Sequence, residues 1–420
     1  MTGQKSTTPP ERGRKRVADD GVSAPGFRGR DAPPGTLRIG ANFDAGSVEI
    51  VSADDPRDVR LNLRKDSAAD FRQWFHFRVQ GARGKPLRMR FLNAGRSAYP
   101  GGWEGYRAVA SYDRRRWFRL PGTWYDGHVL TVECVPERDS IYFAYFEPYS
   151  HERHLDLLGR LETDPLVRAA DLGATVQGRD LNLVTVGEPG PGKQNVWVIA
   201  RQHPGETMAE WFVEGMLERL LDAADPVARR ILERAVLFVV PNMNPDGAVA
   251  GNLRTNAAGA NLNREWLKPS LERSPEVYLV RQRMHETGVD LFLDIHGDEA
   301  LPYVFVDGGS MLPGFTAAQA QRERRFTDSL LAASADFQTG HGYAPDRFSD
   351  ELLTLASKYV GHTFGCLSLT LEMPFKDNAD LPHPECGWSA ARSVRLGAAI
   401  LQPILAHLQS ERREAGPCAQ

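Results

Sequence analysis

A histidine and a glutamate three residues apart, His203 and Glu206, follow an apolar stretch and are separated by Pro and Gly. The stretch at 196–200 predicts a buried strand, and apolar residues at helical spacing over about 207–221 predict a helix. The pair therefore lies between a strand and a helix, where ligands usually bind in an open α/β sheet. Imidazole and carboxylate groups are both good zinc ligands. Taken alone, such a pair more often caps a polar loop, so its interpretation depends on the rest of the chain.

Other polar residues end or interrupt further apolar strands. His296 ends the run Leu-Phe-Leu-Asp-Ile-His, and Glu372 lies inside Leu-Thr-Leu-Glu-Met-Pro. Burying an unpaired carboxylate costs several kcal/mol, so Glu372 needs a partner or a function. Arg254 and Arg264 occur in an Asn- and Gly-rich region. Taken singly, His296 fits a capping residue and each arginine fits a surface salt bridge.

In combination these residues can carry out metal-assisted hydrolysis. Three protein ligands, which leave one position for water, would come from His203, Glu206 and His296. Glu372 could take the proton of that water as a general base. The guanidinium groups of Arg254 and Arg264 could polarise a carbonyl or hold a carboxylate in a bidentate fork. The expected cofactor is one zinc ion per chain.

The second part of the chain alternates between the strand period and the helix period. Strands are predicted at 174–177, 181–186, 196–200, 235–240, 291–295, 303–306 and 368–373. Helices are predicted at about 207–222, 226–233, 274–287, 315–335, 349–358 and 388–407. The apolar runs are short and mostly continuous, as in strands that are covered on both faces. An α/β/α sandwich about a mixed or largely parallel sheet follows.

The preceding part, residues 37–150, alternates with the period of half-buried strands, for example Leu87, Met89 and Phe91 between arginines. Gly and Pro separate these runs at the spacing of an antiparallel sandwich. The predicted strands are 47–51, 59–63, 75–79, 87–91, 108–112, 117–120, 129–135 and 141–146. We expect an all-β antiparallel sandwich domain whose sequence shows no chemistry of its own.

The length of 420 residues exceeds one comfortable hydrophobic core, so two domains and tails are expected. The predicted parts are a disordered tail at 1–36, the β-sandwich domain at 37–150, the catalytic domain at 151–410 and a C-terminal tail at 411–420. The first part has almost no large apolar residues, so burial there cannot offset the entropy cost of ordering the chain.

Composition narrows the choice of partners and compartment. A formal charge of −3 gives no argument for nucleic acid or an anionic membrane as a partner. No apolar run approaches the ~18–20 residues needed to span a bilayer, and the N-terminus lacks the apolar core of a signal peptide. The four cysteines are scattered and include no Cys-x-x-Cys pair, which suits a reducing compartment. We expect a cytoplasmic protein, and the sequence predicts no oligomeric state.

Four motifs follow one another in the second part: His-Pro-Gly-Glu at 203–206, Asn-Leu-Asn-Arg at 261–264, Asp-Ile-His-Gly at 294–297 and Thr-Leu-Glu at 370–372. This series resembles the zinc metallocarboxypeptidases of the funnelin type. The longer forms Arg-x-His-Pro-Gly-Glu and Gly-Asn-x-Arg, with Gln-Trp-Phe at 73–75, resemble the cytosolic carboxypeptidase subgroup. The resemblance covers roughly residues 38–410. It implies a β-sandwich before a carboxypeptidase-like domain, and peptide or protein C-termini as substrates.

The resemblance also implies a role for each matching position. The implied zinc ligands are His203, Glu206 and His296. Glu372 would be the general base and later the proton donor, and Arg254 would stabilise the oxyanion. Asn263 and Arg264 would clamp the terminal α-carboxylate of the substrate, which restricts cleavage to the last residue.

Several positions depart from the family pattern or leave it open. Asp298 and Glu299, after the His296 motif, add acidity near the expected mouth of the site. Asn261 stands where many relatives have an aspartate that orients the first zinc histidine. Relatives use a tyrosine upstream of the catalytic glutamate, and spacing does not choose between Tyr343 and Tyr359. Members of the subgroup remove acidic C-terminal residues, usually glutamate. Lys358 is the predicted positive charge of the pocket for that side chain, with Arg347 as the alternative.

Two other functions remain open. A zinc amidohydrolase of N-acyl amino acids, similar to aspartoacylases and succinylglutamate desuccinylases, shares the His-x-x-Glu…His arrangement, and its substrate would offer a carboxylate to Arg264. A peptidase of peptidoglycan peptides is a variant of the main hypothesis. A non-catalytic pseudo-peptidase would use the cleft and the β-domain to bind a partner, although every expected catalytic position is filled.

Overall fold

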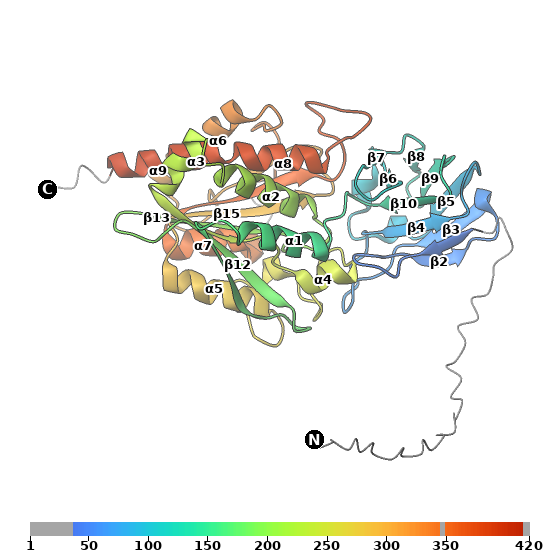
Figure 1. The fold of residues 1–420 in the computed structure, drawn as a ribbon, viewed down its shortest axis with the longest axis horizontal. Coiled ribbons are helices and arrows are strands. Elements are labelled where there is room, and N and C mark those ends of the chain that lie inside the picture. Colours follow the sequence, from blue (N-terminus) through green and yellow to red (C-terminus); the bar gives the residue numbers. More distant parts are fainter. Residues whose placement is uncertain (1–36, 345–348, 415–420) are drawn as a thin grey trace, which may run out of the picture. The chain divides into compact units, whose positions relative to one another are not determined.

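The computed structural model describes residues 37–344 and 349–414, so the tail predicted at 1–36 lies outside the described residues. The described residues belong to one compact unit. Strands with a few short 3-10 turns form its N-terminal portion, here called the β-module, and strands alternating with helices form the rest (Figure 1). No helix among the described residues is long and apolar enough to cross a membrane.

The β-module contains two five-stranded sheets. The first has the order β1 (Arg38–Gly40), β4 (His76–Gln80), β10 (Ser140–Ala144), β6 (Val109–Ser111) and β7 (Phe118–Arg119). The second has the order β2 (Glu49–Ser52), β3 (Val59–Asn62), β5 (Leu87–Phe91), β9 (Leu130–Cys134) and β8 (Thr123–Tyr125). Neighbours pair antiparallel except β3 and β5, which are parallel. The predicted strands are therefore present, and β1 and β8 are additions.

Aromatic side chains join the two sheets of the β-module. The ring of Phe91 in β5 lies 4.7 Å from that of Phe75 and 6.1 Å from that of Phe77 in β4, measured between centroids. All three side chains are fully buried. The alternation that predicted half-buried strands thus points one face of each sheet into a shared core, as in a β-sandwich.

The α/β part is built on a seven-stranded mixed sheet. Its order is β11 (Val167–Ala174), β12 (Asp180–Val186), β14 (Ala235–Val240), β13 (Gln194–Ala200), β15 (Leu291–Asp298), β17 (Leu367–Pro374) and β16 (Phe305–Asp307). The central pairs β14–β13, β13–β15 and β15–β17 are parallel, and the outer pairs are antiparallel. The strand predicted at 174–177 was wrong, because Thr175 and Arg179 close the turn between β11 and β12 there.

The helices are α1 (His151–Leu161), α2 (Met208–Leu220), α3 (Pro226–Leu232), α4 (Pro245–Ala250), α5 (Pro275–Thr287), α6 (Ala317–Ala333), α7 (Ala356–Phe364), α8 (Ala390–Ala399) and α9 (Leu401–Glu414). Short 3-10 turns precede α7 at 349–354 and occur at 56–58, 94–96, 100–103 and 262–264. The single helix predicted at 388–407 is two helices, and Pro403 lies in the first turn of the second, where proline is tolerated. Because α9 reaches Glu414, residues 411–414 are helical and not part of a C-terminal tail.

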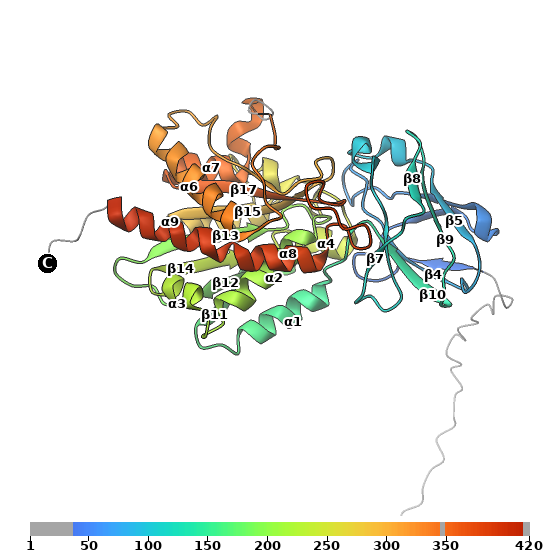
Figure 2. The ribbon, with the colours of Figure 1, turned by 90° about the horizontal axis from the view of Figure 1, so that it is seen from above.

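Helices cover both faces of this sheet, which makes the predicted three-layer sandwich. In β13, Trp197 and Ile199 pack in one core cluster with residues of α5 and α7. The alternate residues Val196 and Val198 pack in the other cluster with α2, α3, α8 and α9. Figure 1 shows α5 and α7 on one side of the sheet, and Figures 1 and 2 show α8 and α9 end to end across the other.

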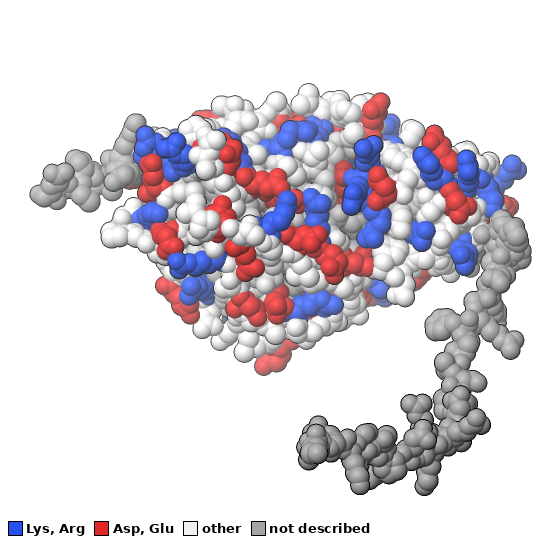
Figure 3. Space-filling model, viewed as in Figure 1, with Lys and Arg blue, Asp and Glu red and all other residues white. Residues whose placement is uncertain are grey.

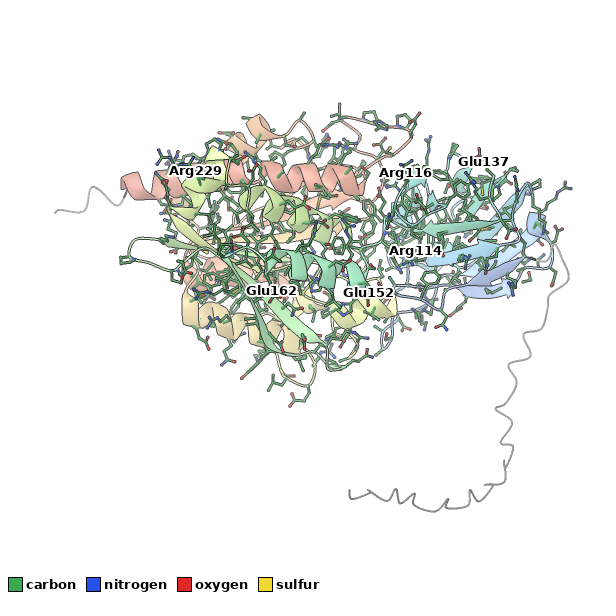
Figure 4. All side chains as sticks on the ribbon, viewed as in Figure 1. Arg114, Arg116, Glu137, Glu152, Glu162 and Arg229 are labelled. Atoms are coloured by element: carbon green, nitrogen blue, oxygen red, sulfur yellow. The ribbon has the colours of Figure 1, made fainter. Side chains whose placement is uncertain are left out.

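Helix α1 connects the β-module to the sheet. The Ser150 side chain caps it by accepting a hydrogen bond from the Arg153 backbone N–H at 3.2 Å. Exposed Glu152 and Glu162 lie at its two ends (Figure 4). On the molecular face shown in Figure 3, acidic and basic side chains are interspersed, so that face carries no extended surface of one sign.

Candidate active site

The predicted functional residues meet at the carboxyl ends of the central parallel strands. The loop after β13 carries His203 and Glu206, β15 carries His296 and β17 carries Glu372. Because β15 and β17 are parallel neighbours, His296 and Glu372 are paired directly in register. The arrangement agrees with the rule that ligands bind outside the carboxyl ends of strands in such sheets.

The three predicted metal ligands form one tight, buried group. The Nδ1 atom of His203 lies 2.6 Å from Glu206 Oε1, and that of His296 lies 2.8 Å from Glu206 Oε2. The two Nδ1 atoms are 3.2 Å apart. Within the part of the chain that the structure describes, no other three His, Cys, Asp or Glu side chains converge in this way. Two nitrogen donors and a carboxylate suit a catalytic zinc with an open position.

The other nitrogen of each imidazole faces an oxygen. His203 Nε2 lies 3.0 Å from Asn261 Oδ1, and His296 Nε2 lies 2.9 Å from Asp294 Oδ1. The Asn261 oxygen also accepts from the Asn263 N–H at 3.2 Å, which supports this orientation of the amide. A proton held on Nε2 of His203 leaves its Nδ1 lone pair directed at the metal position, and the negative charge of Asp294 favours a proton on Nε2 of His296. An amide thus takes the position that an aspartate has in many relatives.

The pKa shifts show how strongly this group attracts positive charge. Burial, with the nearby charge of Arg254, lowers the pKa of His203 to about 3, so this imidazole is neutral. Burial alone would raise the pKa of Glu206, but its interactions with His203 and His296, which include a hydrogen bond to each, lower it. Burial would lower the pKa of His296, but Asp294 and Glu206 outweigh it and hold this pKa well above its usual range. The group therefore attracts positive charge, as a divalent-cation site must.

Arg201 fixes the turn that carries His203 and Glu206. It is buried and has a backbone φ of 57°, in the left-handed region. Its guanidinium donates to the carbonyl of Pro204 at 3.0 Å and to Glu210 Oε2 at 2.7 Å. His154 belongs to the same buried network, since its Nδ1 lies 2.6 Å from Glu210 Oε1. His154 therefore has a structural partner in Glu210 and is not one of the three converging metal ligands.

A cavity of about 140 Å³ lies beside the metal donors. It is lined by every predicted residue except Lys358, namely His203, Glu206, Arg254, Asn263, Arg264, His296 and Glu372. It is smaller than the about 300–1,000 Å³ typical of sites for drug-sized ligands, and suits one terminal residue. The lining residues that the sequence did not indicate include Tyr99 and Asp307.

Three polar side chains on one side of the cavity can bind negative charge. The Nη1 atom of Arg254 is 3.5 Å from Glu206 Oε1, and its Nε has no hydrogen-bond partner among the described residues. Asn263 accepts a hydrogen bond from the Ala356 N–H at 2.8 Å. Arg264 donates through Nη1 to the Asn263 carbonyl at 2.7 Å. These contacts fix Asn263 and Arg264 next to each other at the cavity wall.

Glu372 offers a carboxyl group to the same cavity. Its Oε2 atom has no hydrogen-bond partner among the described side chains and backbone. Burial, opposed in part by His296, raises its pKa well above the usual range. Of the two candidate tyrosines, Tyr343 lines the cavity, whereas the Tyr359 hydroxyl lies 3.1 Å from His285 Nε2, away from the cavity.

Lys358 lies behind the cavity wall. It is buried, its Nζ lies 2.9 Å from Asp307 Oδ2, and it donates to the Gly308 carbonyl. Asp307 is the member of this pair that lines the cavity. The alternative, Arg347, lies outside the described residues. The expectation that the β-module has no chemistry of its own is incomplete, because Tyr99 of this module contributes to the lining. No local sequence signal indicates that contribution.

Comparison with known proteins agrees with this geometry. Residues 39–146 match the family described as the cytosolic carboxypeptidase N-terminal domain, and residues 155–386 match the family described as zinc carboxypeptidase. The chain is 46% identical to an uncharacterized protein of Zymomonas mobilis, over 89% of this chain and 97% of that one. It is 30% identical to mouse cytosolic carboxypeptidase 6, over 80% of this chain and 67% of that one.

Solved structures agree as well. A metallo-carboxypeptidase from Burkholderia cenocepacia is 56% identical, with a TM-score of 0.88 over 90% of this chain and 100% of that one. A metallo-carboxypeptidase from Pseudomonas aeruginosa, solved with (2-guanidinoethylmercapto)succinic acid, is 49% identical, with a TM-score of 0.87 over 89% of this chain and 100% of that one. With both families matched in order, the chain belongs to the zinc carboxypeptidases, and within them to the cytosolic carboxypeptidase subgroup.

Proposed function

We propose that this enzyme hydrolyses the C-terminal peptide bond of peptides or proteins in the cavity described above. The supporting observation is the convergence on one small cavity of three metal ligands, two guanidinium groups and a carboxyl group, that of Glu372, whose Oε2 atom has no hydrogen-bond partner among the described residues. Zinc held by His203, Glu206 and His296 would lower the pKa of a water molecule and polarise the scissile carbonyl. The same relatives are named cytosolic, and we propose a cytoplasmic location for this chain.

Glu372 is the general base in this proposal. Its unpartnered Oε2 can accept the proton of the attacking water and then deliver it to the leaving amine. A carboxylate with a raised pKa is a stronger base than an exposed one once it is ionised. Arg254 supplies N–H donors for the negative charge that develops on the carbonyl oxygen, and its burial strengthens that interaction.

Asn263 and Arg264 hold the terminal α-carboxylate in this proposal. Both line the cavity, and a hydrogen bond from the Arg264 guanidinium to the Asn263 backbone carbonyl holds the arginine beside Asn263. Guanidinium groups bind carboxylates with two parallel hydrogen bonds. Such a clamp fixes the distance from the chain end to the reacting bond, so only the last residue is released.

For the terminal side chain we propose a preference for glutamate, with Lys358 as the source of positive charge. Lys358 is adjacent to the cavity and already shares its charge with Asp307. A substrate carboxylate has to enter beside Asp307, and the ammonium group, which has three donors, has to serve both acids. The preference therefore depends on a lysine that is shielded by an acidic neighbour.

A second candidate is a preference for a basic terminal residue, recognised by Asp307. The favouring observation is that Asp307, and not Lys358, lines the cavity, with its side chain 26% exposed. The ligand named for the Pseudomonas aeruginosa relative combines a guanidino group with a succinic acid. Asp307 would bind the cationic group of such a molecule, and Arg264 would bind its carboxylate.

A release assay on the zinc-loaded chain tests the proposed reaction. Peptides ending in Glu, Asp, Lys, Arg, Phe and Ala are compared with N-acetylglutamate, with and without chelator and with Glu372→Gln. Release of single C-terminal residues that falls by about 10²–10⁴-fold in Glu372→Gln supports the proposal. Cleavage of N-acetylglutamate alone would assign an amidohydrolase instead. Absence of cleavage with zinc bound would favour the pseudo-peptidase.

Two matched variants separate the candidate preferences. If Lys358 recognises glutamate, Lys358→Met lowers release of terminal Glu by about tenfold more than release of terminal Ala. If Asp307 recognises a basic residue, Asp307→Asn lowers release of terminal Lys and Arg in the same selective way. If each variant lowers the release of every terminal residue by the same factor, both preferences are contradicted. Lys358 and Asp307 would then only support the cavity wall.

A further inference from the structure

A carboxylate of the β-module binds the backbone beside Arg254. Asp66 lies in the loop after β3 and is buried. Its oxygens accept four hydrogen bonds: from the N–H groups of Leu253 at 2.6 Å, Arg254 at 2.9 Å and Thr255 at 2.9 Å, and from the Thr255 hydroxyl at 3.0 Å. Three consecutive backbone donors therefore converge on one side chain from the other part of the molecule.

The guanidinium of Arg254 has few contacts of its own to fix it. Its Nε has no hydrogen-bond partner among the described residues, and its Nη1 is 3.5 Å from Glu206. The ring of Tyr99 lies 5.4 Å from its Cζ. Gln73 fixes Tyr99 by accepting from its N–H at 2.8 Å and donating to its carbonyl at 3.1 Å. The direction of Arg254 therefore depends on its own backbone and on Tyr99.

We propose that Asp66 is a positioning residue for Arg254, so that the β-module sets the direction from which the guanidinium reaches the reacting carbonyl. The inference rests on the oxyanion role proposed above for Arg254. A long side chain stabilises developing charge well only if its position is fixed before the reaction, because reorganisation would otherwise consume the gain. The three N–H bonds fix the Cα–Cβ direction of Arg254 at its origin.

The same backbone segment also touches the metal-binding loop. The Gly205 N–H donates to the Leu253 carbonyl at 2.9 Å. Ser67, next to Asp66, donates through its N–H and hydroxyl to Asn252 Oδ1 at 3.1 and 3.0 Å. Loss of Asp66 could therefore act through metal binding instead of through Arg254. A test has to distinguish these two routes.

The first variant is Asp66→Asn in the full-length, zinc-loaded enzyme. It keeps the size of the side chain but turns an NH₂ group toward backbone donors. We expect kcat to fall by about 10–100-fold, the range for groups that orient a functional residue. We expect zinc content to stay unchanged and KM to change less than about threefold. The control is Asp70→Asn, an exposed residue of the same loop paired with Lys65, which leaves kcat unchanged.

A double-mutant cycle with Arg254→Ala identifies the route. If Asp66 acts through Arg254, Asp66→Asn lowers kcat by less than about threefold in the Arg254→Ala background. An equal loss of kcat in both backgrounds, or loss of zinc in Asp66→Asn, would overturn the proposal. If Arg254→Ala itself keeps full kcat, the proposed function of Arg254 fails instead. Should Asp66→Asn not fold, Thr255→Val, which removes only the hydroxyl contact, replaces it in the same cycle with the same criteria.

Discussion

The hydroxyl of Tyr343 lies 2.9 Å from Oε1 of Glu372. The same hydroxyl lies 2.8 Å from Oδ2 of Asp298, whose Oδ1 accepts from the Ala300 and Leu301 N–H groups. A hydroxyl can donate to only one of two carboxyl groups. Because burial raises the pKa of Glu372, a protonated Glu372 can donate to Tyr343 while Tyr343 donates to Asp298. Asp298, which turns the chain after β15, thus orients Glu372 through Tyr343.

Tyr343→Phe is expected to lower kcat by about 10–100-fold, because it removes the group that orients the general base. The ring remains packed on Phe305, whose centroid is 4.9 Å away, so the thermal stability should change little. Steady-state kinetics on zinc-loaded protein measures the effect. The matched control is Tyr359→Phe, which removes a hydroxyl that contacts His285 away from the cavity. A kcat of Tyr343→Phe within about twofold of the parent would contradict the orienting role.

The metal donors could be predicted because each signal is local. His203 and Glu206 share one turn, and His296 and Glu372 end or interrupt apolar strands, which the structure pairs as parallel neighbours. Residues such as Tyr99 reach the cavity through long-range packing, and no local pattern marks them. The same reason applies to the Lys358 prediction, since sequence order cannot show that Asp307 would stand between the lysine and the cavity.

Most helices and strands were predicted from their hydrophobic period, but the 11-residue helix α1 was missed although Leu157, Leu158 and Leu161 are buried along it. The six-residue helix α4 was not predicted, because one and a half turns give too little periodicity, and its Asn244 cap on the Gly247 N–H looks like a turn signal. Strand β11 was misplaced because seven of its eight residues are not buried, which removes the apolar alternation. Its pairing with β12, a tertiary contact, defines it instead.

Removal of the metal is expected to abolish activity and to lower stability. Zinc that binds only the folded state at about 100 times its Kd stabilises it by about 2.7 kcal/mol. Differential scanning calorimetry with zinc, with chelator and after zinc is restored measures this shift, and elemental analysis measures the metal content. His203→Ala should lose the metal and show no chelator-dependent shift. His151→Ala, a histidine outside the donor group, is the control. Full activity of metal-free protein would contradict the assignment.

Glu276, at the start of α5, is expected to make stability depend on pH. Burial, opposed in part by the Asn256 amide at 3.1 Å, raises the pKa of this carboxyl group from 4.5 to about 7. A carboxyl group whose pKa is higher in the folded state contributes stability that is complete below about pH 4.5 and is lost as the pH rises through about 7. The shift corresponds to about 3 kcal/mol at most.

Glu276→Gln removes this dependence, because the amide cannot ionise. Chemical denaturation at about pH 5 and about pH 8 measures the effect. From the lower to the higher pH, the free energy of unfolding of the parent should fall by up to about 3 kcal/mol more than that of the variant. Glu286→Gln on the same helix, where Glu286 is half exposed and paired with Arg283, should follow the parent. If the parent and Glu276→Gln differ by a constant amount at both pH values, the raised pKa is wrong.

Arg119 of β7 should be among the most sensitive positions for stability. It is buried, and its guanidinium donates to four backbone carbonyls: Arg107 at 2.7 Å, Phe375 at 2.8 Å, Trp388 at 2.9 Å and Cys386 at 3.2 Å. Three of these acceptors lie in the segment after β17, so the side chain joins the β-module to the strand that carries Glu372.

Arg119→Met keeps much of the volume but leaves these carbonyls without a donor, which should lower the free energy of unfolding by about 3–5 kcal/mol. Denaturant titration measures this loss. The control is Arg116→Met, because Arg116 is exposed near the same strand (Figure 4) and its replacement should cost less than about 0.5 kcal/mol. A loss of less than about 1 kcal/mol for Arg119→Met would mean that water satisfies the carbonyls when the arginine is absent. The contact between the β-module and the segment after β17 would then depend mainly on apolar packing, such as that of Phe375 against Tyr145, whose ring centroids are 4.6 Å apart.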